Sequence, residues 1–399
     1  MSKLLTKGTI ALLLILICGS AMASNVPPEN SGIEKSEYII PFTQDAHAII
    51  VKVRINDSPH EFSFIFDTGA RTIINEAVAD ELGIERGRRL PTWDADIKAY
   101  AGVADKIAVG DAEVDSMNLI IFDFLKYAGF YGLDGLIGAD FMSHFRVTID
   151  YHNQQLIFSH DTTAIPADSN SYSMDFMLNP MMGTPITMCS LSGIINEYGM
   201  IDTGSPFAII LPLSMLERFE DSLDLDLVES VGEIAKWPMS KTDQNYLSRL
   251  DSFKIGDFEL QNAPVIFADI FSILIGEELL SKFTITLDFH NGKLLLTPNA
   301  DACFDAEVYS TGLKIKDTGD GRHIVRGYWK GSPAELAGLR PGDEILEMDS
   351  KPIGDYSKSE QQALLNDPLV DSLQFKIKDG HGEIKNVTVG KAFLLPPVR

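Results

Sequence analysis

The sequence contains one long stretch twice, and this repeat constrains the fold more than any other feature. Residues 136–156 align without a gap to residues 274–294, and the identical positions include Gly138 with Gly276. Both copies alternate apolar and polar residues and are rich in β-branched and aromatic side chains, which is typical of strands. Self-similarity over a long period indicates repeated architecture. Because there are only two copies, we expect a mainly β protein with two antiparallel lobes rather than a solenoid.

A second repeated element precedes each of these stretches. The tripeptide Asp-Thr-Gly occurs at residues 67–69 and at residues 202–204, each time after an apolar run. A single such triplet is typical of a tight turn, because Asp and Gly are common turn residues. Two copies within one repeat indicate instead that each lobe contributes one carboxylate. Two adjacent carboxylates cannot both ionise cheaply, so they share a proton and supply a base and an acid at the same pH.

The order and spacing of these elements resemble the pepsin/retropepsin clan of aspartic proteases. In that clan each lobe carries an Asp-Thr-Gly and, later, two apolar residues followed by Gly. The compact lobes are similar to those of bacterial retropepsin-like proteins with two lobes in one chain. The resemblance implies that Asp67 and Asp202 activate a water molecule for peptide-bond hydrolysis, with no cofactor and no metal. It also implies that four neighbouring residues support the dyad: Thr68, Gly69, Thr203 and Gly204.

The two copies differ at the residue after the glycine, which is Ala70 in the first and Ser205 in the second. Ala70 has no hydroxyl group that could bond to the carboxylates. Such a bond favours the ionised form of a carboxyl group, so its absence raises the pKa. We therefore expect a pH optimum less acidic than that of a digestive pepsin.

A flap covers the cleft in this clan. Its expected counterpart in the first lobe is residues 96–103, with Tyr100 and Gly102 at the tip, although an ordinary surface hairpin would give the same pattern. Residues 236–246 occupy the corresponding place in the second lobe. The acidic, leucine-spaced stretch 220–231 before them has the pattern of a solvated helix face or a loop.

The domain boundaries follow from the repeat. We expect the first lobe at residues 37–160, a linker at 161–170 and the second lobe at 171–298. An insertion at residues 124–134, rich in Phe, Tyr and Gly, either shapes the substrate cleft or covers an edge of the first lobe.

The pattern changes near residue 308, and residues 331–348 resemble part of a PDZ domain spanning 308–392. Ser332 has the position of a helix N-cap, with Pro333 as the first helical residue. PDZ domains add a peptide strand to a sheet edge and often hold the terminal carboxylate in backbone N–H groups. The peptide loop implied by the resemblance contains Thr311, Gly312 and Leu313. It departs from the usual two-glycine loop, so capture of a peptide, capture of a C-terminus and a docking or regulatory role all stay open.

The N-terminus has the pattern of a secretory signal peptide at residues 1–23. Lys3 and Lys7 precede the apolar run 10–18, and Ala-Met-Ala at 21–23 forms a cleavage site. The apolar run is too short to span a bilayer. We therefore expect an exported protein, periplasmic or secreted, without stable membrane insertion.

The composition of the chain limits the classes of binding partner that we expect. The formal net charge of −24 disfavours nucleic acid and anionic membrane surfaces. In an exported protein Cys189 and Cys303 could either pair or remain isolated thiols. The expected partners are a polypeptide substrate and a peptide or C-terminal ligand of the PDZ domain. Two functions remain: an exported aspartic endopeptidase, which the two intact Asp-Thr-Gly triplets favour, or a protease-like scaffold that no longer cuts and acts through its PDZ domain.

Overall fold

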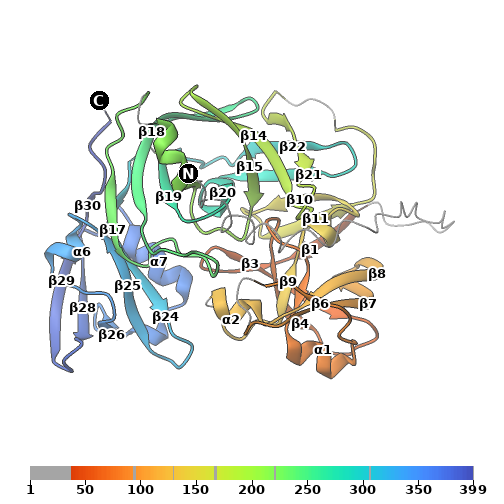
Figure 1. Ribbon diagram of the computed structural model, residues 1–399, viewed down its shortest axis with the longest axis horizontal. Helices are drawn as coiled ribbons and strands as arrows, with labels where there is room; N and C mark the ends of the chain where they lie inside the picture. The colour runs from red at the N-terminus through yellow and green to blue at the C-terminus, as the bar shows by residue number, and fades with distance from the viewer. Residues whose placement is uncertain are drawn as a thin grey trace, which may run out of the picture.

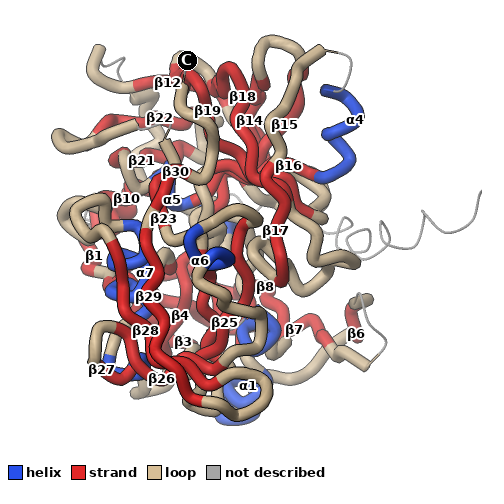
Figure 2. Tube along the Cα trace, turned by 90° about the vertical axis from the view of Figure 1, so that its left-hand side faces the viewer, coloured by secondary structure: helices blue, strands red, loops and turns tan. Residues whose placement is uncertain are grey.

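The structure is a computed structural model in which strands far outnumber helices (Figures 1 and 2). It describes residues 37–92, 96–128, 130–165, 169–219, 222–304 and 307–398. The expected signal peptide, residues 1–23, lies outside the described residues. The mainly β fold class predicted from the sequence is confirmed.

The first lobe is built on an eight-stranded sheet with the order β2-β3-β4-β9-β5-β8-β7-β6. Its strands are β2 (Thr43–Asp45), β3 (Ala48–Ile55), β4 (Phe62–Phe66), β5 (Ile73–Ile74), β6 (Arg89–Leu90), β7 (Ala99–Val109), β8 (Ala112–Ile121) and β9 (Gly135–Ile137). Its helices are α1 (Glu76–Leu82), α2 (Phe124–Ala128) and α3 (Ala139–Met142). Strands β4 and β9 run parallel with Phe66 opposite Ile137, so the residues that follow both strands meet at one end of the sheet.

The second lobe repeats this arrangement. Its strands are β13 (Met177–Leu178), β14 (Pro185–Leu191), β15 (Ile195–Asp202), β16 (Ile209–Pro212), β17 (Val228–Gly232), β18 (Tyr246–Ile255), β19 (Phe258–Ala268) and β20 (Ile273–Gly276). Its helices are η2 (Leu213–Met215), α4 (Leu216–Phe219) and α5 (Glu277–Leu280). Strands β15 and β20 are parallel, with Asp202 opposite Gly276.

A six-stranded sheet with the order β1-β11-β10-β21-β22-β12 joins the lobes. Its strands are β1 (Glu37–Pro41), β10 (Arg146–Asp150), β11 (Gln155–Ser159), β12 (Tyr172–Asp175), β21 (Phe283–Asp288) and β22 (Lys293–Pro298). The two copies of the sequence repeat meet at its centre, where β10 and β21 pair antiparallel. Thr148 lies opposite Thr286, and their hydroxyl groups are hydrogen-bonded at 2.9 Å.

The repeated aromatic residues form the core beneath this sheet. Phe145 and its counterpart Phe283 are both 0% exposed, and they belong to one hydrophobic cluster that runs through both lobes. Full burial of one such side chain stabilises the fold by about 1.5–3 kcal/mol. The identity of these two positions in the sequence therefore reflects equivalent places in the core.

The C-terminal domain, residues 307–398, has its own sheet and core. Its strands are β23 (Tyr309–Ser310), β24 (Leu313–Asp317), β25 (His323–Trp329), β26 (Glu344–Met348), β27 (Lys351–Pro352), β28 (Ser372–Lys378), β29 (Ile384–Gly390) and β30 (Ala392–Phe393). Its helices are α6 (Pro333–Leu336), η3 (Ile353–Asp355) and α7 (Lys358–Asn366). As expected, Ser332 caps α6, and its hydroxyl oxygen accepts a hydrogen bond from the Glu335 amide at 3.4 Å.

The sheet of the C-terminal domain is continuous with that of the second lobe. Strand β17 pairs with β18 through Val228 and Glu229, and then with β25 through residues 230–232. The expectation that residues 220–231 form a helix face or a loop is thus wrong for the part from Val228 onward. The strand forms there because β25, about a hundred residues later in the chain, supplies its second partner.

The C-terminal domain also touches the first lobe. The amide of Ala46, in the turn between β2 and β3, donates to the Ser359 hydroxyl at the start of α7 at 2.8 Å. The Lys358 ammonium lies 5.2 Å from the centre of the Phe130 ring. Gly319, in the turn after β24, lies against the Tyr131 ring, so the insertion at residues 124–134 contacts this domain. In Figure 1, β24 is accordingly the strand of the domain nearest to α2.

Candidate active site

The two aspartates lie at equivalent ends of parallel strand pairs. Asp67 follows β4 directly, and Asp202 is the last residue of β15. Each carboxylate accepts a hydrogen bond from the glycine amide two residues later: Gly69 donates to Asp67 Oδ1 at 2.8 Å, and Gly204 donates to Asp202 Oδ1 at 3.0 Å. This local bond is common for Asp in turns and fixes the carboxylate at the end of each loop.

Each carboxylate faces the loop of the other lobe. A Cβ atom on Gly69 would lie 2.4 Å from Asp202 Oδ1, and one on Gly204 would lie 2.4 Å from Asp67 Oδ2. No side chain fits at either position. The structure therefore brings together the two aspartates that the sequence placed in separate lobes.

The threonines of the two triplets hold the loops together. The Thr68 amide donates to the Thr203 hydroxyl, and the Thr203 amide donates to the Thr68 hydroxyl, each at 3.0 Å. The Thr68 hydroxyl donates to the Ile201 carbonyl at 2.7 Å, and the Thr203 hydroxyl donates to the Phe66 carbonyl at 3.2 Å. Both threonines are buried, so every bond in this set lies away from water.

The later glycines of the repeat allow a strand to pass closely behind each loop. A Cβ atom on Gly138 would lie 2.5 Å from the Ala70 carbonyl oxygen, and one on Gly276 would lie 2.7 Å from that of Ser205. A side chain at either position would push the adjacent Asp-Thr-Gly loop out of place. This explains why the sequence repeats a glycine there.

Burial dominates the electrostatics of the pair. It raises the pKa of Asp67 from 3.8 to about 6, although the Gly69 and Gly204 amides act in the opposite direction. Asp202 is only 6% exposed, and burial, followed by the nearby charge of Asp67, raises its pKa well above the usual range. The two carboxyl groups titrate as a pair, and burial holds their shared proton to a higher pH than an isolated carboxyl group would hold it.

Ser205 does not act as a hydroxyl donor to the dyad. Its side chain is buried, and Oγ has no hydrogen-bond partner among the described residues. Its backbone groups are engaged instead: the amide donates to the Asp202 carbonyl oxygen at 3.1 Å, and the carbonyl accepts from the Glu277 amide at 2.8 Å. Since Ala70 has no hydroxyl group either, the two lobes are alike in this respect, and both lack a side-chain bond that would lower the pKa of the pair.

The expected flap residues lie in a hairpin of the first lobe, but not at its tip. Tyr100 is in β7, opposite Arg89 of β6 on one side and Ile121 of β8 on the other, and Gly102 follows in the same strand. The turn of this hairpin comes earlier, between β6 and β7. The tip position was wrong because pairing on both sides extends β7 back to Ala99.

The corresponding hairpin of the second lobe is bound to the C-terminal domain. Glu233, which follows β17, forms ion pairs with Lys236 at 3.0 Å and with Lys316 and Arg326 at 3.6 Å each. Its amide also donates to the Arg326 carbonyl at 3.0 Å. Sequence reasoning missed this contact, and no local signal could have shown it, because two of the three cations lie in the other domain.

The expected peptide loop of the C-terminal domain is closed on itself. Gly312 has a φ of +75°, which favours glycine. Its amide donates to the Ser310 hydroxyl at 3.2 Å, and the Leu313 amide donates to the buried Thr311 hydroxyl at 3.2 Å. Two of the backbone donors that could hold a terminal carboxylate are thus already hydrogen-bonded within the loop.

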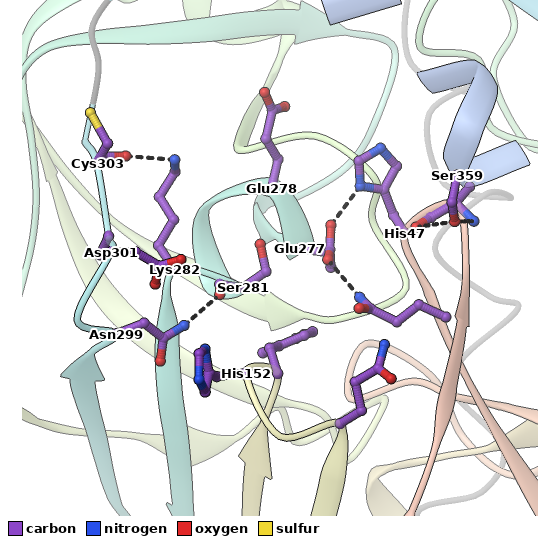
Figure 3. A pocket seen from close by; sticks show the side chains of 15 residues that line it. His47, His152, Glu277, Glu278, Ser281, Lys282, Asn299, Asp301, Cys303 and Ser359 are labelled. Carbon is purple, nitrogen blue, oxygen red and sulfur yellow. Dashed lines mark hydrogen bonds and ion pairs between the residues drawn. The ribbon is translucent and has the colours of Figure 1, made fainter. Parts of the chain in front are cut away.

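A separate cavity of about 700 Å³ opens where both lobes meet the C-terminal domain (Figure 3). The buried Glu277 carboxylate lies in it, 2.5 Å from His47 Nδ1 and 3.2 Å from the Gln44 amide nitrogen. Tyr151 and Ser359 are also part of its wall. No residue of either Asp-Thr-Gly lines this cavity, so it is distinct from the dyad.

Neither a metal site nor a membrane-spanning helix is found among the described residues. No group of three or more His, Cys, Asp or Glu there could hold a metal ion. No helix in the described ranges is long and apolar enough to cross a membrane. Cys189 is buried and Cys303 is exposed, and both are free thiols.

Comparison with known families agrees with this geometry. Residues 51–141 match the family model described as aspartyl protease, and residues 325–368 match the model of the PDZ domain. The first match includes Asp67 and the glycine at position 138. A comparison with curated proteins found no match. The predicted combination of an aspartyl protease-like domain with a C-terminal PDZ domain is therefore confirmed.

Proposed function

We propose that this protein is an exported aspartic endopeptidase that hydrolyses peptide bonds in polypeptide substrates. The observation that carries the proposal is the facing pair of carboxylates, Asp67 and Asp202, each held against the glycine of the opposite loop. The reciprocal threonine bonds support it, since they fix both loops before substrate arrives. Export rests on the signal-peptide pattern of residues 1–23.

The shared proton gives the two carboxyl groups complementary roles. The ionised one takes a proton from the attacking water, and the protonated one donates its proton to the carbonyl oxygen of the scissile bond. The tetrahedral intermediate then collapses: the amide nitrogen accepts the proton taken from the water and leaves, while a hydroxyl group of the intermediate returns a proton to the other carboxylate. A carboxylic acid and an amine form, and the pair again shares one proton. No covalent bond to the enzyme forms. The buried surroundings strengthen the hydrogen bonds to the developing charge.

The PDZ domain is proposed to recruit the substrate or a partner peptide. Strand β24 pairs only with β25 among the described strands, so its other edge is free to add a peptide strand. The closed loop at Thr311 and Gly312 favours an internal segment over a C-terminus.

The test is hydrolysis of an unfolded protein and of a peptide library by the purified chain from Ser24 onward. The wild type is compared with the variants Asp67→Asn and Asp202→Asn at pH values from 3 to 9. Cleavage by the wild type alone supports the dyad. Equal cleavage by both variants would overturn it.

The alternative of an inactive scaffold is an outcome of the same experiment. It would show as peptide binding to all three proteins without cleavage by any of them. The intact geometry of both loops favours the enzyme. A scaffold that no longer cuts would have no need to keep glycine at positions 69 and 204, where the close contacts leave no room for a side chain.

A further inference from the structure

Lys314 is a cation that has no anionic partner. It lies in β24 with its ammonium group 5.0 Å from the centre of the Phe207 ring. Across the described residues its side chain forms no hydrogen bond and no ion pair. Burial and the charge of Arg326 lower the pKa of its amine to about 8, while Glu278 acts weakly in the opposite direction. A partly desolvated charge is costly unless it is paired, so the site lacks an anion.

The sheet geometry directs Lys314 toward the second lobe. Leu313 and Ile315, on either side of it, pack in the core of the PDZ domain. Successive side chains of a strand point to opposite faces, so Lys314 and Lys316 share the other face. A bulge in β25 adds Arg326 to this face, because the register shifts between Lys314 and Ile315.

Positive charge is in excess on this face. Glu233 is the acidic partner of Lys316 and Arg326, and it shares Lys236 with Asp243. Lys314 stands outside this set, next to Arg326. The formal net charge of the chain is −24, so such a local excess of cations attracts anions selectively to this face.

The ring beneath Lys314 belongs to the catalytic loop. Phe207 is the third residue after Gly204, and its carbonyl oxygen lies 2.0 Å from where a Cβ of Gly276 would be. Gly276 in turn is the strand neighbour of Asp202. Phe207 also packs on a cluster that contains Met200 of β15. Lys314 therefore stands over the loop that follows Asp202.

We propose that Lys314 is a specificity-determining residue that binds a side-chain carboxylate of the polypeptide substrate beside this loop. The inference rests on the proposed protease function and adds the substrate class: extended polypeptides with an acidic residue near the cleaved bond. It also makes a residue of the PDZ domain part of the substrate-binding site. The closed loop at Thr311 and Gly312 is not needed for this contact.

The first test needs no variant. Pairs of peptides that differ only by Glu or Gln, at each position around a cleaved bond, are compared by their kcat/KM from pH 5 to 10. At one position the Glu peptide is expected to be preferred roughly 10- to 100-fold, as for a charge-assisted contact in a site that excludes water. The preference should fade as the pH rises through about 8, because Lys314 loses its charge there. The titration of the dyad cancels in the ratio.

The second test replaces the side chain. Lys314→Met should remove the preference for Glu while kcat/KM for the Gln peptide stays within about twofold, and Lys314→Arg should retain it. Lys378→Met is the matched control, since Lys378 lies on β28 of the same sheet in an exposed pair with Glu344. Cleavage without any Glu preference, or a preference unaltered in Lys314→Met, overturns the inference and leaves the protease function standing. An effect that disappears when the peptide C-terminus is amidated also overturns it, because the ligand would then be a terminal carboxylate.

Discussion

Gly69 of the first lobe lies so close to Asp202 of the second that a Cβ atom there would be 2.4 Å from the carboxylate oxygen. We predict that Gly69→Ala lowers kcat/KM by roughly 100-fold or more, because a displacement of about 1 Å within a catalytic pair has that effect. Gly354→Ala is the control, since a Cβ there would meet nothing within 4 Å. Peptide hydrolysis, assayed at saturating and at limiting substrate concentrations, measures the activity of both variants. Full activity in Gly69→Ala would contradict the facing arrangement.

The threonine pair should matter for stability as well as for rate. Thr68→Val removes a buried hydroxyl that accepts from the Thr203 amide and donates to the Ile201 carbonyl. We expect a loss of about 2–4 kcal/mol in the free energy of unfolding, because both buried partners are left unsatisfied. Chemical denaturation measures it. Thr148→Val, at the hydroxyl pair of the interlobe sheet, should cost less and leave hydrolysis intact.

The pH dependence follows from the raised pKa values of the dyad. The pair is fully protonated, and so inactive, below the first ionisation, which burial moves from 3.8 to about 6 at Asp67. We therefore expect kcat/KM to rise with pH through about 6 and to fall only when the second carboxyl group of the pair ionises at higher pH. A pH–rate profile measured with an uncharged peptide checks this. A maximum below about pH 3 would contradict it.

The raised pKa also gives a stability prediction. Between pH 3.8 and about 6 the folded protein holds a proton on Asp67 that the unfolded chain has released, so stability falls as pH rises through this window. Asp67→Asn cannot ionise and should gain about 1–3 kcal/mol over the wild type at pH 8 but almost nothing below pH 4. Denaturation curves at both pH values measure the difference. A gain that is the same at both would show that the effect is not electrostatic.

Much of the site was predictable from the sequence because its parts are local and repeated. The glycines at 69, 138, 204 and 276 mark close approaches, and the repeat shows that they occur twice. The pairing of β17 with β25 was not predictable, because residues 230–232 gain their partner from a distant segment. Long-range pairing also explains why the tip of the flap was misplaced. Pairing with β6 and β8 extends β7 through the residues where the turn was expected. Lys314 was missed for the same reason, since its contact with Phe207 joins two domains.

The continuous sheet should couple the PDZ domain to the second lobe. A Cβ atom on Gly327 of β25 would lie 2.6 Å from the Val231 carbonyl oxygen, so Gly327→Ala should force β17 away from β25. We expect faster hydrogen exchange at residues 230–232, by roughly tenfold for each 1.4 kcal/mol of lost pairing. Hydrolysis should weaken too, because Glu233 and the hairpin after β17 lose their anchor. Gly380→Ala, in an open turn of the same domain, is the matched control. Unchanged protection of residues 230–232 in Gly327→Ala would mean that the second-lobe hairpin is held without β25.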